Sequence, residues 1–272
     1  MRQLVQALRT VLFYIPYMGQ TVLLALFLGL YVAIVPRPKA FAWRVASYWY
    51  KANVALLGWI AGIETLVDGA ENIPDGPLIF ASKHQSNWDV FAILPYCNNE
   101  PAFIAKRELM DIPFFGWAAK AVNTIPIDRK LGVEAIPRML GDARAALERG
   151  CRIIIFPEGT RKAPLARPEY RQGIVRMYEA LGVPVVPVAL NSGLFWGRHA
   201  TMWPGRCRAR FLPAIPPGLG AAEFSARLER AIETESARLI EQAVAEGLSR
   251  PVGAEFMARL ADAVQGNAVQ DR

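Results

Sequence analysis

A histidine and an aspartate lie five residues apart in SKHQSNWD, the segment from Ser82 to Asp89. Residues five apart on one helix point about 140° away from each other, so His84 and Asp89 cannot share a helical face. They can meet if His84 lies in a loop and Asp89 lies in the first turn of the next helix, for which Ser86 or Asn87 is a suitable cap. The carboxylate would then fix the imidazole tautomer and leave the second ring nitrogen as a general base.

The same segment also has a purely structural interpretation, in which Asp89 caps the helix and His84 is a solvated loop residue. A Ser–His–Asp hydrolase is a weaker alternative, because the sequence contains no GxSxG motif. A base that activates the hydroxyl of a substrate needs no protein nucleophile. The catalytic interpretation therefore favours group transfer to an alcohol.

A second polar segment, FPEGTR, follows the apolar run RIII and places Glu158, Gly159, Thr160 and Arg161 in a tight turn. Gly159 permits unusual backbone angles, and Arg161 is suited to bidentate phosphate binding. Glu158 is expected either to accept from a substrate hydroxyl or to hold Arg161 in place. The alternative is a turn with an internal ion pair. The segment lacks the GxxxxGK[ST] pattern of a P-loop.

Four further cations, Lys106, Arg107, Arg129 and Lys130, lie near the ends of expected strands. Such charges are usually solvated, but their position beside two polar loops favours an anion-binding cleft. The net charge of +7 likewise suits partners that carry phosphate. Nucleic acid is not expected as a partner, because the aromatic residues lie apart from the cations and no basic recognition helix is present.

From Leu66 onward, strand-like and helix-like patterns alternate. We therefore expect an α/β fold: a mixed, largely parallel sheet flanked by helices, preceded by an N-terminal membrane-associated two-helix segment. Loops that carry chemistry follow the carboxyl ends of strands in such sheets, as both polar segments do here. Strands are expected within residues 65–69, 77–82, 101–105, 123–129, 151–160, 184–190 and 208–215, and helices at 89–96, 114–121, 133–149, 173–181 and 221–248, with a frayed tail from 265.

The amino-terminal region contains 25 uncharged residues, Val11–Val35. As a helix this stretch would be about 37 Å long, which is enough to cross a bilayer. Positive charge on both sides leaves its orientation open, and a bend near Pro16 would permit a re-entrant path. Aromatic and basic residues within 41–66 predict a second, interfacial helix. A buried helix pair of a soluble domain is the alternative.

The chain of 272 residues accordingly divides into a membrane-attaching segment (1–65), an α/β domain (66–220) and C-terminal helices with a tail (221–272). Three scattered cysteines, Cys97, Cys151 and Cys207, form no CxxC pair and indicate a reducing compartment. With so few cysteines and only two histidines, a metal site is not expected. The second histidine, His199, has no nearby carboxylate and is expected to be structural or interfacial.

The order of the polar blocks resembles the glycerolipid acyltransferase family, specifically bacterial 1-acyl-sn-glycerol-3-phosphate acyltransferases. The similar blocks are HQSNWD, then FIAKREL through FFGW and NTIPIDR, then FPEGTR and VPVAL, over about residues 69–217. One departure is Asn123, where many relatives carry glycine. Asparagine tolerates a left-handed backbone, so the turn is expected to survive.

The resemblance implies that His84 deprotonates the acceptor hydroxyl and that Asp89 orients it. It places Glu158, Gly159, Thr160 and Arg161 in the lysophosphatidic acid site. By the same resemblance Lys106 and Arg129 assist with the phosphate or the acyl carrier, and Pro187 shapes the acyl-donor side.

The implied reaction transfers an acyl chain from acyl-CoA or acyl-acyl carrier protein to the sn-2 hydroxyl of lysophosphatidic acid, giving phosphatidic acid, with no cofactor. The implied location is the bacterial inner membrane, with membrane lipid as a partner and the catalytic domain facing the cytoplasm. Glycerol 3-phosphate or lyso-ornithine lipid as acceptor, and a non-catalytic lipid-binding protein, are the alternatives.

Overall fold

The computed structural model describes residues 2–35, 39–97, 101–113, 115–198 and 201–270. Seven strands form one sheet in the order β1-β7-β6-β2-β5-β3-β4. Neighbouring strands are parallel except β6 and β7, which are antiparallel. The expectation of a mixed, largely parallel sheet is therefore confirmed. The strands are β1 (Ile63–Asp68), β2 (Ile79–Ser82), β3 (Pro101–Lys106), β4 (Ile125–Ile127), β5 (Arg152–Ile155), β6 (Val185–Leu190) and β7 (Gly205–Phe211).

The central strands β2, β5 and β6 are buried along their whole length. Their sequences, IFAS, RIII and VVPVAL, are nearly continuous apolar runs, as expected for parallel strands covered on both faces. Alternate side chains enter two separate cores: Phe80 and Ile154 belong to one cluster, and Ile79 and Ile153 to the other. This alternation decides on which side of the sheet each following loop residue lies.

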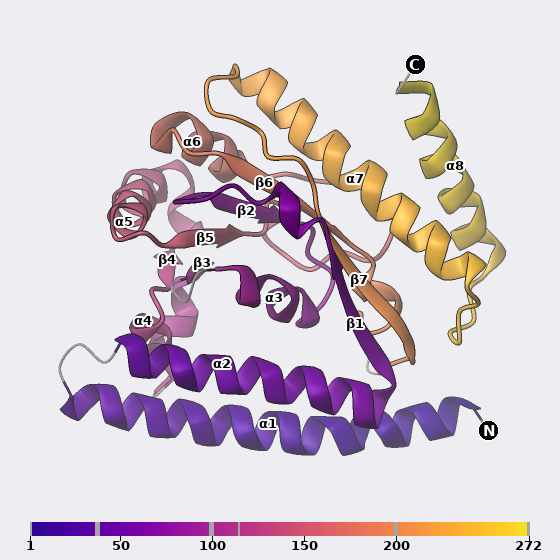
Figure 1. Ribbon diagram of the computed structural model, residues 1–272, viewed down its shortest axis with the longest axis horizontal. Helices are drawn as coiled ribbons and strands as arrows, with labels where there is room; N and C mark the ends of the chain where they lie inside the picture. Colours follow the sequence, from indigo (N-terminus) through magenta and orange to yellow (C-terminus); the bar gives the residue numbers. More distant parts are fainter. Residues whose placement is uncertain (1, 36–38, 98–100, 114, 199–200, 271–272) are drawn as a thin grey trace.

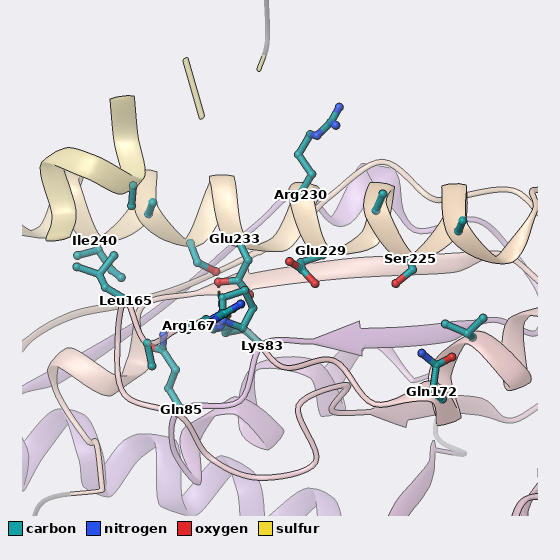
Figure 2. Close-up of a pocket in the computed structure, with 18 of the residues that line it drawn as sticks. Lys83, Gln85, Leu165, Arg167, Gln172, Ser225, Glu229, Arg230, Glu233 and Ile240 are labelled. Carbon is teal, nitrogen blue, oxygen red and sulfur yellow. Dashed lines mark hydrogen bonds and ion pairs between the residues drawn. The ribbon is translucent and has the colours of Figure 1, made fainter. Parts of the chain in front are cut away.

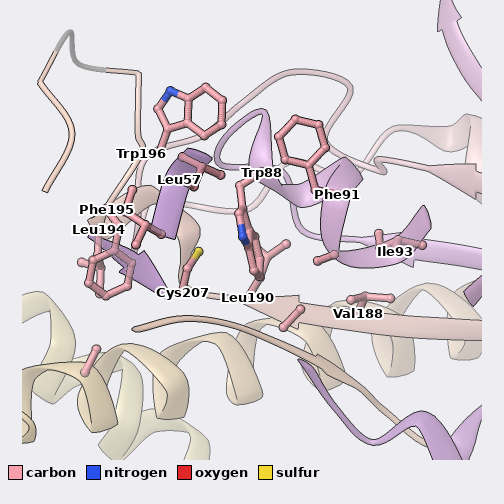
Figure 3. Packing of buried hydrophobic residues seen from close by; sticks show 14 of the residues in the cluster. Leu57, Trp88, Phe91, Ile93, Val188, Leu190, Leu194, Phe195, Trp196 and Cys207 are labelled. Carbon is pink, nitrogen blue, oxygen red and sulfur yellow. The ribbon is translucent and has the colours of Figure 1, made fainter. Parts of the chain in front are cut away.

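Helices cover both faces of the sheet (Figure 1). On one face lie α1 (Arg2–Ile34), α2 (Lys39–Leu56) and the short α3 (Trp88–Ile93), and Trp88 and Trp196 pack there in the core (Figure 3). On the other face lie α5 (Ile136–Glu148), α6 (Gln172–Leu181) and α7 (Ala221–Ala245), with α8 (Ala254–Gln270) against α7. The helix α4 (Phe115–Ala121) packs against α1.

The long helix α1 is uninterrupted from Arg2 to Ile34 and continues through Pro16, where the sequence would permit a bend. It is long and apolar enough to cross a membrane by length and composition, although one such helix is weak evidence for a span. One side of it is fixed to the α/β domain: Tyr14 accepts a hydrogen bond from Trp196 Nε1 (2.9 Å), and Thr10 accepts one from the backbone N–H of Met202 (2.9 Å).

Some element boundaries differ from expectation. The helix expected from residue 133 begins at Ile136, where Pro137 suits the first turn, and residues 129–135 form a 3-10 segment kinked at Gly132. The tail expected to fray from residue 265 stays helical to Gln270. The turn at Asn123 has φ 57°, so its predicted left-handed conformation is confirmed.

Candidate active site

The two polar loops meet at one edge of the sheet, because β2 and β5 are adjacent and parallel. The backbone N–H of Lys162 donates to the carbonyl oxygen of His84 at 2.8 Å. The imidazole of His84 stacks on the ring of Phe156, with centroids 3.9 Å apart and planes 20° apart. The loop after β5 therefore fixes both the backbone and the ring plane of His84.

His84 and Asp89 are in contact, in the arrangement expected from their spacing. His84 lies in the loop after β2, Asp89 lies in the first turn of α3, and His84 Nδ1 is 2.9 Å from Asp89 Oδ2. The Asp89 side chain is fully buried, whereas 19% of the His84 side chain is exposed. Because Nδ1 faces the carboxylate, the second imidazole nitrogen, Nε2, is the one available to a substrate.

The Asp89 carboxylate is held by further donors besides the imidazole. Its Oδ2 accepts from the backbone N–H groups of Gln85 (2.7 Å) and Ser86 (2.9 Å). Its Oδ1 accepts from the hydroxyls of Ser86 (3.0 Å) and Ser192. These bonds leave the carboxylate little freedom to rotate, so the imidazole has a fixed partner.

The helix cap differs in detail from expectation. Asn87 occupies the position before α3 but makes no capping hydrogen bond with its side chain. The hydroxyl of Ser86 instead accepts from the backbone N–H of Trp88 at 3.0 Å. Of the two suggested capping residues, only Ser86 therefore bonds an N–H of the helix.

Glu158 pairs with a lysine rather than with Arg161. Its Oε1 lies 2.9 Å from the buried Lys83 Nζ, and its Oε2 accepts from the backbone N–H of His84 at 3.3 Å. Burial raises the pKa of the Glu158 carboxyl, and the neighbouring Lys83 cation acts in the opposite direction. Of the two roles expected for Glu158, the structure does not show the contact with Arg161 among the described residues, because this carboxylate is directed to Lys83 and the His84 backbone.

Arg161 lies beside the histidine loop, where its Nη1 donates to Asn87 Oδ1 at 3.3 Å. Gly159 has φ 66°, a left-handed conformation that lets the turn reverse sharply before Arg161. Thr160 is exposed at the surface of the turn. The half-buried side chain of Arg161 therefore contacts the loop that carries His84.

The structure does not bring every predicted residue to this point. Lys106 is exposed at the end of β3, two strands from β2, and among the described residues no hydrogen bond or ion pair joins it to either loop. Arg129 begins the 3-10 segment after β4, but its side chain lies outside the described residues. Pro187 is buried in β6, opposite Ala81. His199 lies outside the described residues.

Three contacts of this site were not predicted from the sequence: those of Ser192, Lys83 and Phe156. Ser192 follows β6 by two residues, and its position just after the VPVAL block was an available signal. Phe156 directly follows β5, and Lys83 directly precedes His84. Their participation depends on which face of the sheet each side chain occupies.

Comparison with known proteins agrees with this geometry. A family model described as Acyltransferase matches residues 64–191, a range that includes both polar loops. Over 213 residues the chain is 33% identical to the 1-acyl-sn-glycerol-3-phosphate acyltransferase of Pseudomonas aeruginosa, which covers 78% of this chain and 82% of that protein. The chain belongs to this acyltransferase family. The resemblance noted in the sequence is thereby confirmed, and the protein is an enzyme.

A curated human protein and a solved bacterial structure are also similar to this chain. The human 1-acyl-sn-glycerol-3-phosphate acyltransferase alpha is 30% identical over 161 residues, and the match spans 58% of this chain and 57% of the human protein. A crystal structure of the 1-acyl-sn-glycerophosphate acyltransferase from Thermotoga maritima superposes with a TM-score of 0.68 at 24% identity. It covers 88% of this chain and 99% of that one. This last likeness shows the fold.

Proposed function

We propose that this acyltransferase moves an acyl chain from a CoA or acyl carrier protein thioester to the sn-2 hydroxyl of lysophosphatidic acid, giving phosphatidic acid. The observation that carries the proposal is the 2.9 Å contact between His84 Nδ1 and the buried Asp89 carboxylate, in which Nε2 takes no part. The printed names of the relatives give the acceptor class.

In this mechanism His84 Nε2 takes the proton of the acceptor hydroxyl, and the oxygen attacks the thioester carbonyl. The tetrahedral intermediate expels the thiolate, which recovers the proton from the imidazolium and leaves as a free thiol. Asp89 fixes the tautomer and stabilises the imidazolium that forms. Since acyl transfer is direct, no metal or cofactor is required, and addition of a chelator should leave the rate unchanged.

Arg161 would bind the phosphate of the acceptor. A guanidinium can donate two parallel hydrogen bonds to phosphate oxygens. Its contact with Asn87, on the same loop as His84, sets the distance between the bound phosphate and the base. An acceptor that carries a phosphate near its free hydroxyl fits this arrangement.

We propose that α1 lies in the plane of a membrane surface instead of crossing it. Its outer side is a stripe of exposed apolar residues that includes Leu8, Ile15 and Leu23, at 60%, 67% and 67% exposure. Its inner side packs on α2 and α4. A spanning orientation would draw the attached α/β domain into hydrocarbon, whereas an interfacial one leaves that domain in water. The proposed location is the inner bacterial membrane, on the cytoplasmic side.

The experiment supplies the purified protein in vesicles with acyl-CoA or acyl-acyl carrier protein and one acceptor at a time, and resolves the lipid products. The acceptors are lysophosphatidic acid, glycerol 3-phosphate and lyso-ornithine lipid. We expect free thiol and phosphatidic acid in equal amounts, and only with lysophosphatidic acid. Transfer to another acceptor, or thiol release without any acceptor, would overturn the proposal.

A further inference from the structure

The residue before His84 is a buried cation held between two carboxylates. The side chain of Lys83 is 2% exposed. Its Nζ lies 2.9 Å from Glu158 Oε1, and 2.7 Å and 2.9 Å from the two carboxylate oxygens of Glu233. Glu233 belongs to α7, 150 residues further along the chain, and Figure 2 shows it directed at Lys83.

This cluster lies on the opposite side of the loop from the imidazole. Side chains after β2 alternate, so Lys83 follows Ala81 on the face covered by α7, while His84 turns toward α3 and Asp89. The cluster therefore contacts the loop on the side opposite the contact between His84 and Asp89.

A continuous series of hydrogen bonds joins α7 to the backbone of the histidine. The hydroxyl of Tyr170 donates to Glu233 Oε1 at 2.9 Å, and Glu233 binds Lys83. Lys83 binds Glu158, whose other oxygen accepts from the His84 N–H. A change in the position of Glu233 would therefore move Lys83 and Glu158, and with them the two polar loops.

The charges in this cluster are costly to bury. A buried cation needs a partner, and Glu158 alone already supplies one. Adding Glu233 places two carboxylates around one ammonium. Buried ion pairs add little net stability compared with apolar residues of similar volume. A contribution to folding is therefore a poor explanation for the second carboxylate, whereas a fixed geometry behind the active-site loop is a good one.

We propose that Glu233, acting through Lys83, is a positioning residue that holds the His84 backbone and the Glu158 turn in the geometry required for acyl transfer. The inference rests on the proposed role of His84 as the base. The pair acts on the reaction step and contributes little to substrate binding, because it lies behind the loop.

The test uses two variants and one matched control. Glu233→Gln keeps the shape of the side chain and removes its charge. Glu233→Leu replaces the carboxylate by an apolar group and leaves the buried Lys83–Glu158 ion pair intact. Lys83 and Glu233 line a pocket of about 770 Å³ (Figure 2). Glu229→Gln is the control, because Glu229 lies on α7 and lines the same pocket.

We expect both variants to lower kcat by about 10-fold or more, since small misplacements of reacting groups are costly. The KM for each substrate and the midpoint of thermal unfolding should stay near those of the control. A wild-type kcat in folded Glu233→Leu would overturn the inference, as would a fall in kcat that follows the loss of folded protein. If Glu233→Leu does not fold, Glu233→Gln decides alone by the same criteria.

His84→Ala is assayed in the same series so that the two proposals can fail separately. An active His84→Ala would overturn the proposed base and with it the positioning role. An inactive His84→Ala beside fully active Glu233 variants would overturn only the positioning role.

Discussion

Ser192 donates a hydrogen bond to the Asp89 carboxylate across 103 residues of sequence. The bond joins the loop after β6 to the first turn of α3, and it occupies the carboxylate oxygen that does not face His84. The orientation of the His84–Asp89 pair therefore depends on the loop after β6 as well as on the loop after β2 and the start of α3.

Replacing this serine should slow the reaction without unfolding the protein. A hydrogen bond to a charged group contributes about 1.5–3 kcal/mol to the stability of the arrangement it holds. If that amount is lost from the transition state, the rate falls by a factor of ten for about every 1.4 kcal/mol. We expect Ser192→Ala to lower kcat by about 10-fold or more, measured as phosphatidic acid formed at saturating substrate. Ser225→Ala on α7 is the control. An unchanged kcat in Ser192→Ala would show that this bond has no part in orienting Asp89.

The carboxylate itself should matter more than its serine partner. Asp89→Asn keeps the size of the side chain but introduces an amide that can donate toward His84, which favours the wrong tautomer. We expect kcat to fall by at least about 10²-fold, with a smaller change in the KM for lysophosphatidic acid. Asp75→Asn, at an exposed loop position, is the matched control. Nearly normal turnover in Asp89→Asn would leave Asp89 only a structural role, in which it binds the backbone N–H groups of Gln85 and Ser86.

Much of this arrangement could be predicted from the sequence because it is local. The distance between His84 and Asp89 depends on the loop of residues 83–87 and the start of one helix. Both polar loops follow apolar runs that clearly predict strands. The left-handed turn at Asn123 is likewise a property of the residue type. Such features need no knowledge of distant parts of the chain.

The parts that could not be predicted depend on long-range packing. The partners of Lys83 and Asp89 on α7 and after β6 follow from which face of the sheet each side chain enters. The antiparallel pairing of β6 with β7 cannot be read from either strand alone. Proline has no N–H to donate within the helix. The packing of α1 on α2 and α4 offsets this loss at Pro16, so the helix continues. The division at residues 65 and 220 stays a prediction.

The guanidinium of Arg161 should govern binding of the acceptor. Arg161→Lys keeps the positive charge but loses the planar pair of donors that suits phosphate. We expect the KM for lysophosphatidic acid to rise by about 10-fold, with a smaller effect on the KM for the acyl donor. Initial rates over a range of acceptor concentrations measure this, with Arg149→Lys as control. Equal acceptor KM values in the two variants would exclude Arg161 from the phosphate site.

The apolar stripe of α1 should attach the protein to lipid. The double substitution Leu8→Glu, Ile15→Glu places two charges at exposed positions, where they oppose burial among acyl chains. We expect the variant to remain in the soluble fraction when wild type floats with vesicles in a density gradient. Met257→Glu, an exposed position on α8, is the control. Flotation of the α1 variant at the wild-type level would contradict the interfacial placement.

One ion pair gives a dependence of stability on pH. Arg208 donates to both oxygens of Glu246 (2.9 Å and 2.8 Å), and these hydrogen bonds hold the pKa of Glu246 below its usual range. A carboxyl with a lowered pKa in the folded state adds stability above its unfolded pKa, and this is lost as the pH falls through the folded value. Glu246→Gln should therefore lower the thermal midpoint at pH 7, and the difference from wild type should shrink toward pH 4.

The control is Glu241→Gln, because Glu241 is an exposed residue near Glu246 at the end of α7. If Glu246→Gln destabilises the protein equally at both pH values, the effect comes from packing and not from the charge on Glu246.

The most direct measurement is acyl transfer by His84→Ala beside His199→Ala, the same substitution at the other histidine of the chain. Equal amounts of each protein in vesicles receive lysophosphatidic acid and the acyl donor that the wild type accepts, and phosphatidic acid is quantified. We expect a loss of at least about 10²-fold in His84→Ala and little change in His199→Ala. Equal phosphatidic acid from both variants would contradict the assignment of His84 as the base.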